Sequence, residues 1–185
     1  MKKFLFFLLL IISCHPDGDD NNFDTTPYTI ITPYNFPQML IPEGNLLTQE
    51  GVQLGKKLFF DPILSSNNTI SCASCHIQEN SFSDPSQYSV GVNGDVGFRN
   101  AFSLVNIGWN SSFNWDGSAS SLENQVFEPV TNPIEMANNW AQVEEDLNRD
   151  SEYRDLFKQA FNVDCIDSIH VAKAIAQFER TLISS

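Results

Sequence analysis

Three residues in one short stretch have the types and spacing needed to bind haem covalently. Cys72 and Cys75 lie three positions apart, and His76 follows the second cysteine directly. Each thiol can add across one vinyl group of a haem, and the histidine is then held where its ring can ligate the iron. The stretch therefore predicts one covalently attached haem c, with His76 as the axial ligand on the proximal side.

Two other kinds of site use a Cys-x-x-Cys pair. A thioredoxin-type dithiol occurs in a βαβ setting, and no such pattern surrounds these residues. A zinc site needs a second pair of Cys or His ligands, and the remaining cysteines and histidines do not supply a pair at zinc-binding spacing. These remaining residues are Cys14, His15, Cys165 and His170. Haem attachment therefore stays the strongest prediction.

The sequence before the cysteines predicts a helix. Thr48 can cap a helix that runs to about Phe60, and Asp61-Pro62 would end it. Gly55, in the middle of this helix, lowers its intrinsic stability. Close packing of the glycine against another helix would explain its presence.

The sequence after the cysteines predicts a loop and then more helices. From 77 to 115 there is little periodicity and much Gly, Ser and Asn, which indicates a long loop with short turns around the haem. Further helices are expected at 120–127, ended near Pro129, and at 139–147, 152–161 and 168–182. No strand-like alternation of any length occurs. The predicted fold is an all-α, cytochrome c-like domain with an extended haem-wrapping loop.

The N-terminus has the pattern of an export signal. Lys2 and Lys3 precede nine consecutive apolar residues, a core too short to span a bilayer permanently. The core ends in Ile11-Ile12-Ser13-Cys14, which resembles the lipobox of bacterial lipoproteins. On this interpretation residues 1–14 are a lipoprotein signal peptide and Cys14 carries a lipid, the only membrane anchor. An ordinary signal peptide is the alternative, and both place the protein on the periplasmic side of the cell envelope.

Residues 15–45 connect this signal to the domain. They are polar at first, then dotted with prolines, and they carry no helical period. We interpret them as a flexible tether followed by an extended arm that lies on the domain. Their aromatic residues are candidates for packing against it: Phe23, Tyr28, Tyr34 and Phe36. Residues 46–185 are then one domain, long enough to bury a core of its own.

The charge of the chain restricts its partners. It has 185 residues, with 10 Lys and Arg against 23 Asp and Glu, and a formal net charge of −13. So acidic a surface argues against nucleic acid and against anionic membrane surfaces. It would suit docking of a basic redox protein, although solubility alone is an equally good explanation.

Several separated motifs resemble those of a known family. The run 54–62, Leu-Gly-Lys-Lys-Leu-Phe-Phe-Asp-Pro, precedes the cysteines, and Arg99-Asn100 and 113–117 follow them. Ser-Leu-Glu-Asn-Gln at 121–125 and Asn-Pro-Ile-Glu-Met at 132–136 come next. In this order and spacing they resemble the N-terminal haem domain of the bacterial di-haem cytochrome c peroxidases, a family that includes the methylamine-utilisation di-haem proteins. The resemblance covers about residues 46–184.

The resemblance suggests roles for three residues inside the expected pocket. Glu135 is the candidate acid–base: cleaving the O–O bond of peroxide needs a proton moved so that water leaves, and a carboxyl in a partly dry pocket can do this. Gln125 matches the pocket glutamine of the family and could hydrogen-bond peroxide. Trp115 matches a tryptophan that relays electrons between two haems, although a lone tryptophan is more often core. Without the motif, Glu135 would be a helix-start residue favoured by the helix dipole.

Two further residues are candidates for binding groups. Arg99 could neutralise a haem propionate. Asn100 matches a ligand of the calcium ion that the family holds between its domains, but a single amide oxygen is a poor calcium site alone.

The opposite face of the iron is expected to be open. In many of these peroxidases a histidine in a Ser-x-Gly-His stretch occupies this position at rest, and the matching stretch here ends in Val92. No histidine lies between His76 and His170. Because Val92 stands in place of that histidine, we expect a haem site that needs no reductive activation. The alternative is a sixth ligand from His170 or a methionine.

The predicted function is reduction of hydrogen peroxide to water, with electrons from a small periplasmic cytochrome c or copper protein. Family members continue into a second domain with its own haem, and this chain stops at Ser185. We therefore expect a truncated chain, or a second haem domain supplied by another chain. Two alternatives remain open: a mono-haem electron-transfer cytochrome c, and oxidation of a protein side chain by a methylamine-utilisation-type haem protein.

Overall fold

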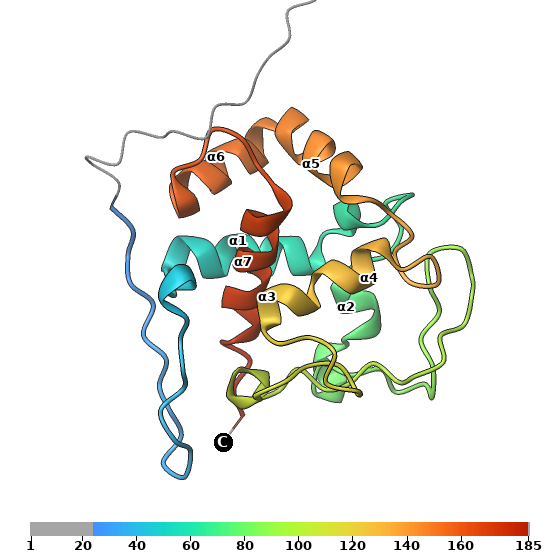
Figure 1. Cartoon of the computed structure of the whole chain (residues 1–185), viewed down its shortest axis with the longest axis horizontal. Coiled ribbons are helices and arrows are strands. Elements are labelled where there is room, and N and C mark those ends of the chain that lie inside the picture. The colour runs from blue at the N-terminus through green and yellow to red at the C-terminus, as the bar shows by residue number, and fades with distance from the viewer. Residues whose placement is uncertain (1–23, 185) are drawn as a thin grey trace, which may run out of the picture.

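The computed structural model describes residues 24–184. The predicted signal peptide, Cys14 and Phe23 lie outside the described residues. The α-helices are α1 (Gln49–Phe60), α2 (Cys72–Cys75), α3 (Leu122–Gln125), α4 (Phe127–Thr131), α5 (Trp140–Arg149), α6 (Ser151–Phe161) and α7 (Ser168–Glu179), shown in Figure 1. Within 24–184, strand pairing is limited to isolated bridges, so the all-α prediction is confirmed. No helix of this part of the chain is both long and apolar enough to cross a membrane.

The core is built where α1 and α7 cross (Figure 1). α1 begins as predicted, because the Thr48 hydroxyl accepts a hydrogen bond from the Gly51 amide at 3.0 Å, and it ends at Asp61. A Cβ on Gly55 would lie 1.8 Å from the Ala174 carbonyl oxygen. Only glycine allows the two backbones to approach this closely, which confirms the predicted close packing.

Two short helices replace the single helix expected at 120–127. α3 ends at Gln125, and α4 begins at Phe127 and contains Pro129, so the prediction that the helix ends near Pro129 is wrong. Proline is tolerated in the first turn of a helix, where its missing N–H would have no partner in any case. The other helices lie within three residues of their predicted bounds, and α7 ends at Glu179 rather than near Leu182.

Residues 65–118, here called the haem segment, form the long loop that the sequence predicts. They include α2 and the single 3₁₀ turns η4 (Gln78–Asn80) and η5 (Ile107–Trp109). Seven of the nine positive-φ residues in the described chain lie in this segment: Asn68, Ser81, Phe82, Gly94, Asn106, Asn114 and Gly117. Its course is therefore set by tight turns rather than by periodic packing.

The N-terminal arm contacts the domain at several places and projects from it at one turn. The Phe36 ring lies 4.8 Å from the Trp109 ring, and the Trp109 indole N–H donates to the Pro37 carbonyl at 2.8 Å. Tyr34 is fully exposed, because the turn that holds it extends beyond the domain (Figure 1). The predicted packing of aromatic residues is thus confirmed for Phe36 and wrong for Tyr34. Tyr28 is 37% exposed.

Candidate functional site

The one-turn helix α2 holds both thiols. Ser71 caps it: its side chain accepts from the backbone of Ser74, and the Ser74 hydroxyl accepts from the Ser71 amide at 3.0 Å. This reciprocal pairing stabilises a helix that is too short to form on propensity alone. Cys72 and Cys75 therefore project from the same turn into one cavity.

His76 is oriented by its own segment. Its backbone N–H donates to the Cys72 carbonyl at 2.9 Å, and its Nδ1 lies 3.0 Å from the Phe82 carbonyl oxygen. A carbonyl can only accept, so Nδ1 carries the proton and Nε2 has the free lone pair that a metal requires. Burial lowers the pKa of His76, which keeps the ring neutral as metal ligation demands.

A cavity of about 400 Å³ opens beside these three residues. Its wall combines the thiols and the imidazole with apolar side chains from distant segments: Leu64, Ile70, Phe98, Phe102, Val126, Val130, Ile134 and Ile175. An apolar wall with two thiols and one oriented imidazole fits a flat apolar macrocycle that carries an iron. Cys72, Cys75 and His76 would hold such a group.

The thiols are poorly suited to the two rival kinds of site. Burial raises the pKa of Cys72 to about 12 and also raises the pKa of Cys75. Dithiol oxidoreductases and thiolate metal sites need a lowered thiol pKa, because the thiolate is the reactive form. In addition, residues 24–184 contain no cluster of three or more His, Cys, Asp or Glu that could hold a metal ion.

Glu135 and Gln125 both line this cavity, although they belong to different segments. Burial raises the pKa of Glu135, and the nearby Glu128 adds to the effect, while the Asn132 amide donates to Glu135 at 2.9 Å and opposes it. The structure thus provides the partly dry environment that a proton-transferring carboxyl requires. Among residues 24–184, the Gln125 side-chain amide has no hydrogen-bond partner, so it is available to a ligand in the cavity.

Trp115 and Arg99 lie at the rim of the cavity. Trp115 is 63% exposed, and its indole N–H donates to the Asn100 carbonyl at 2.7 Å, so the alternative of a core tryptophan is wrong. Arg99 forms an ion pair with Asp116 at 2.7 Å, and this contact lowers the pKa of Asp116. Both side chains of the pair are about half exposed. An exposed aromatic ring therefore stands where an incoming partner could reach it.

The sequence matches one family model over most of its length. Residues 49–185 fit the di-haem cytochrome c peroxidase family. The chain belongs to this family. It is 42% identical over 144 residues to the methylamine utilization protein MauG of Methylorubrum extorquens, covering 77% of this chain and 41% of that protein. It is 37% identical over 155 residues to the cytochrome c peroxidase Ccp of Escherichia coli, covering 81% and 32%.

The solved structures agree with the family. A MauG-like protein associated with microbial copper homeostasis superposes with a TM-score of 0.79 at 33% identity, over 85% of this chain and 47% of that one. The chain thus spans less than half the length of the relatives it matches. The family consists of oxidoreductases, since its named members include cytochrome c peroxidases.

Asn100, the residue predicted to bind calcium, is hydrogen-bonded within the haem segment. The Asn100 amide nitrogen donates to the Asp84 and Ser86 carbonyls at 3.2 and 2.7 Å, and its oxygen lies 3.4 Å from the Ser83 hydroxyl. Asn100 therefore connects two parts of the haem segment, residues 83–86 and its own position, by hydrogen bonds. A calcium ion would need further oxygen ligands, because it takes six to eight.

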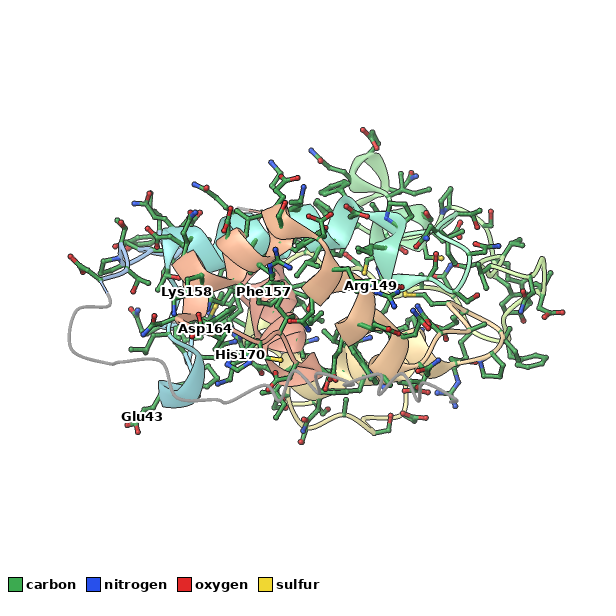
Figure 2. All side chains as sticks on the ribbon, turned by 90° about the horizontal axis from the view of Figure 1, so that it is seen from above. Glu43, Arg149, Phe157, Lys158, Asp164 and His170 are labelled. Carbon is green, nitrogen blue, oxygen red and sulfur yellow. The ribbon has the colours of Figure 1, made fainter. Side chains whose placement is uncertain are left out.

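Among the histidines and methionines of residues 24–184 that could act as a sixth ligand, Met136 lines the cavity, whereas His170 and Met39 do not. His170 lies in the first turn of α7, with its Nδ1 2.7 Å from Asp167 and its ring 5.4 Å from that of Phe161, in the region labelled in Figure 2. It is not among the cavity-lining residues, and neither is Met39, which packs against Gly108. Met136 is buried and does line the cavity. The Val92 amide donates to the Glu135 carbonyl at 2.8 Å.

Sequence reasoning assigned no role to three titratable residues that line the cavity: Asp116, Glu128 and Glu179. Glu179 is the last residue of α7 and lines the cavity one turn after Ile175. A signal was present, because Glu179 follows the otherwise apolar face that Val171 and Ile175 define, and a charge on that face is unusual.

Proposed function

We propose that residues 49–184 form a peroxidatic haem c domain that reduces hydrogen peroxide to water. The reaction takes up two electrons and two protons for each peroxide, and releases two waters. The observation that carries the proposal is the cavity itself, where the Cys72, Cys75 and His76 constellation meets Glu135 and Gln125. An electron carrier would need the first three residues only.

Different side chains of the cavity would have different roles in this reaction. When bound, the haem iron supplies the redox chemistry that cleaves the O–O bond. Glu135 would move a proton from one peroxide oxygen to the other, so that water leaves rather than hydroxide. Its raised pKa favours this role, because proton transfer is most efficient when the pKa lies near the working pH. The Gln125 amide would orient peroxide or the departing water by hydrogen bonding.

Electron delivery requires a partner. Trp115, exposed at the cavity rim, is the proposed relay to a second haem domain, on the same or another chain. The electron donor to that assembly would be a small cytochrome c or copper protein, and a net charge of −13 favours a donor with a basic face. Calcium at Asn100 would be completed only in that larger assembly.

The location follows from the cofactor and the N-terminus. Covalent haem attachment takes place on the periplasmic side of the inner membrane, in agreement with the predicted signal at residues 1–14. A lipid on Cys14 would keep the protein at the envelope, and residues 15–45 would act as a tether between the lipid and the domain. A Cys14→Ala variant that stays in the membrane fraction would argue against the lipid.

The test of the function is removal of the proposed proton carrier. Glu135→Gln should slow the reaction with peroxide by about two orders of magnitude or more, the range of a lost general acid–base. Cyanide binding and the optical spectrum should change little, because the isosteric amide leaves the cavity shape intact. The measurement is stopped-flow mixing of haem-loaded protein with peroxide.

A matched control comes from a carboxylate outside the cavity. Glu43, in the 3₁₀ turn η2 (Glu43–Asn45), is exposed and does not line the cavity. Glu43→Gln should react with peroxide at close to the wild-type rate. Equal, small effects of both substitutions would contradict the peroxidase proposal.

Oxidation of a protein side chain is the second candidate, and the 42% identity to a methylamine utilization protein favours it. This reaction would use the same cavity and the same exposed Trp115. It differs in its product, which is a covalently modified partner protein. Mass spectrometry of candidate partners after peroxide treatment would separate the two activities.

A further inference from the structure

Glu179 is a buried acid that the proposed function does not use. Its side chain is 4% exposed, in the last turn of α7. With Ile175, one turn earlier, it forms part of the cavity wall. A glutamate is almost never buried this fully unless it is paired or has a function.

Glu179 is not paired within the described chain. Among residues 24–184, only the Trp140 indole N–H and the Glu179 Oε2 are buried side-chain polar atoms without a hydrogen-bond partner. Trp140 packs on Phe127 and does not line the cavity, so Glu179 alone combines both features. The adjacent Arg180 is committed elsewhere, because its guanidinium donates to both oxygens of Glu123, at 2.7 and 3.1 Å.

The neutral form of Glu179 is favoured in this setting. Burial raises its pKa to about 8, the negative charge of Glu123 adds to this rise, and the positive charge of Arg180 opposes it. The position at the C-terminal end of α7 acts in the same direction, since the negative end of a helix dipole disfavours a carboxylate. Near neutral pH a small electrostatic change can therefore move a proton on or off this group.

Two acids thus stand beside the two thiols. Glu179 acts electrostatically on Cys72, whereas Glu135 acts on Cys75. The proposed iron ligand, His76, draws its own polar neighbours from the haem segment: Phe82, Phe102 and Asp84. Glu179 would therefore act on a bound haem from the side that Cys72 would hold, and it is not among the groups that shift the pKa of His76.

We propose that Glu179 is a haem-tuning residue, a buried carboxyl that takes up one proton when the site accepts one electron. The electron comes from a one-electron donor protein and goes to the iron, and the proton comes from solvent and goes to the Glu179 carboxylate. The coupling is electrostatic, because added negative charge in a poorly solvated cavity favours protonation of a nearby acid. The inference rests on the proposed haem site, not on the peroxidase reaction.

The other charged groups around Glu179 have partners of their own. Arg180 pairs with Glu123, and although burial acts to raise the pKa of Glu123, hydrogen bonds from Arg180 and Asn45 outweigh it and hold that pKa below its usual value. The Cys72 sulfur ceases to titrate once it forms a thioether. On α1, which packs against α7, Lys57 is paired with Glu152. Glu135, across the cavity, is the remaining acid with a raised pKa.

The test is the reduction potential of the haem-loaded full chain against pH, from about pH 6 to about pH 10. The potential should be constant on the acid side and fall as the pH rises through the Glu179 range. The slope should approach, and not exceed, about 59 mV per tenfold change in proton concentration, the limit for one proton per electron. Glu179→Gln should remove this slope, whereas Glu43→Gln, at an exposed carboxylate outside the cavity, should retain it. Any contribution of Glu135 is common to all three proteins.

A second measurement on wild-type protein guards against a variant that does not fold. The infrared difference spectrum between the reduced and oxidised forms should contain a band of a protonated carboxyl. A wild-type potential that stays flat across the pH range, or a slope unchanged in Glu179→Gln, would overturn the inference. These results require attached haem, so they differ from failure of the proposed haem site, in which the chain would carry no haem, and from failure of the peroxidase reaction, which the peroxide kinetics measure separately.

Discussion

The α1–α7 crossing and the haem segment are ordered in different ways. At the crossing, Leu54, Leu58 and Ala174 have no exposed surface, and Ile175 has 1%. The haem segment instead exposes Phe98 to 81% and Trp115 to 63%, and its turns are held by side-chain to backbone hydrogen bonds, such as those of Asn100. The crossing supplies its own apolar contacts, whereas the segment has few.

This difference identifies which part depends on the cofactor. Burial of apolar surface contributes about 25 cal/mol per Å², so a region with little buried apolar area gains little stability from its own side chains. A macrocycle in the cavity would provide the missing apolar contacts. Loss of the thiols should therefore disorder the haem segment, whereas changes in packing should destabilise the α1–α7 crossing.

The largest effect is expected from removing both thiols. Cys72→Ala with Cys75→Ala should abolish covalent haem retention, and the haem segment should lose its native order because it has little else to collapse on. Haem staining of the denatured protein measures the first effect, and amide hydrogen exchange of the segment measures the second. Stain that persists in the double variant would rule out the attachment site.

A packing change should act on the crossing instead. Gly55→Ala places a methyl group against the Ala174 carbonyl and should lower the free energy of unfolding by about 3 kcal/mol. Gly44→Ala is the matched control, because nothing lies within 4 Å of the new Cβ; it should be neutral or stabilising by up to about 1 kcal/mol. Urea denaturation of both variants gives the comparison. A similar loss in both would mean that the helices do not approach as described.

The smallest effect should come from the ion pair at the cavity rim. Arg99→Ala breaks an exposed pair with Asp116 and should change the free energy of unfolding very little. Arg180→Ala removes a buried guanidinium from the partly buried Glu123 carboxylate and should cost about 3 kcal/mol. Thermal unfolding of the two variants would show the contrast. Equal losses of unfolding free energy would mean that the exposed Arg99–Asp116 pair and the Arg180–Glu123 pair contribute equally to stability.

The helices were predictable where the sequence carries a local signal. Thr48 as a cap and Pro62 as a breaker fix the limits of α1. The prediction from Pro129 was wrong because the effect of a proline depends on its position within a helix. The start of α4 at Phe127 carries no local signal in the sequence. The helix α2 has no apolar period, being a single turn held by Ser71 and Ser74. Tyr34 was expected to pack because aromatic residues usually do, and nothing local shows that its turn projects.

The candidate site was predictable as a set of residues, but not as an arrangement. The sequence indicated Cys72, Cys75 and His76 from spacing, and Glu135 and Gln125 by resemblance. The pairing of Arg99 with Asp116, 17 residues away, depends on how the loop folds back. The cavity position of Met136 could not be predicted either, since a methionine in an irregular segment has no periodic context.

The most direct test of the peroxidase proposal is the optical spectrum of the purified, haem-loaded ferric protein. An accessible sixth position predicts a largely high-spin spectrum, with cyanide binding that needs no prior reduction. Met136 is the alternative ligand in the cavity, and Met136→Leu serves as the control that removes it. A low-spin wild-type spectrum that becomes high-spin in Met136→Leu would contradict the proposal and indicate an electron-transfer cytochrome.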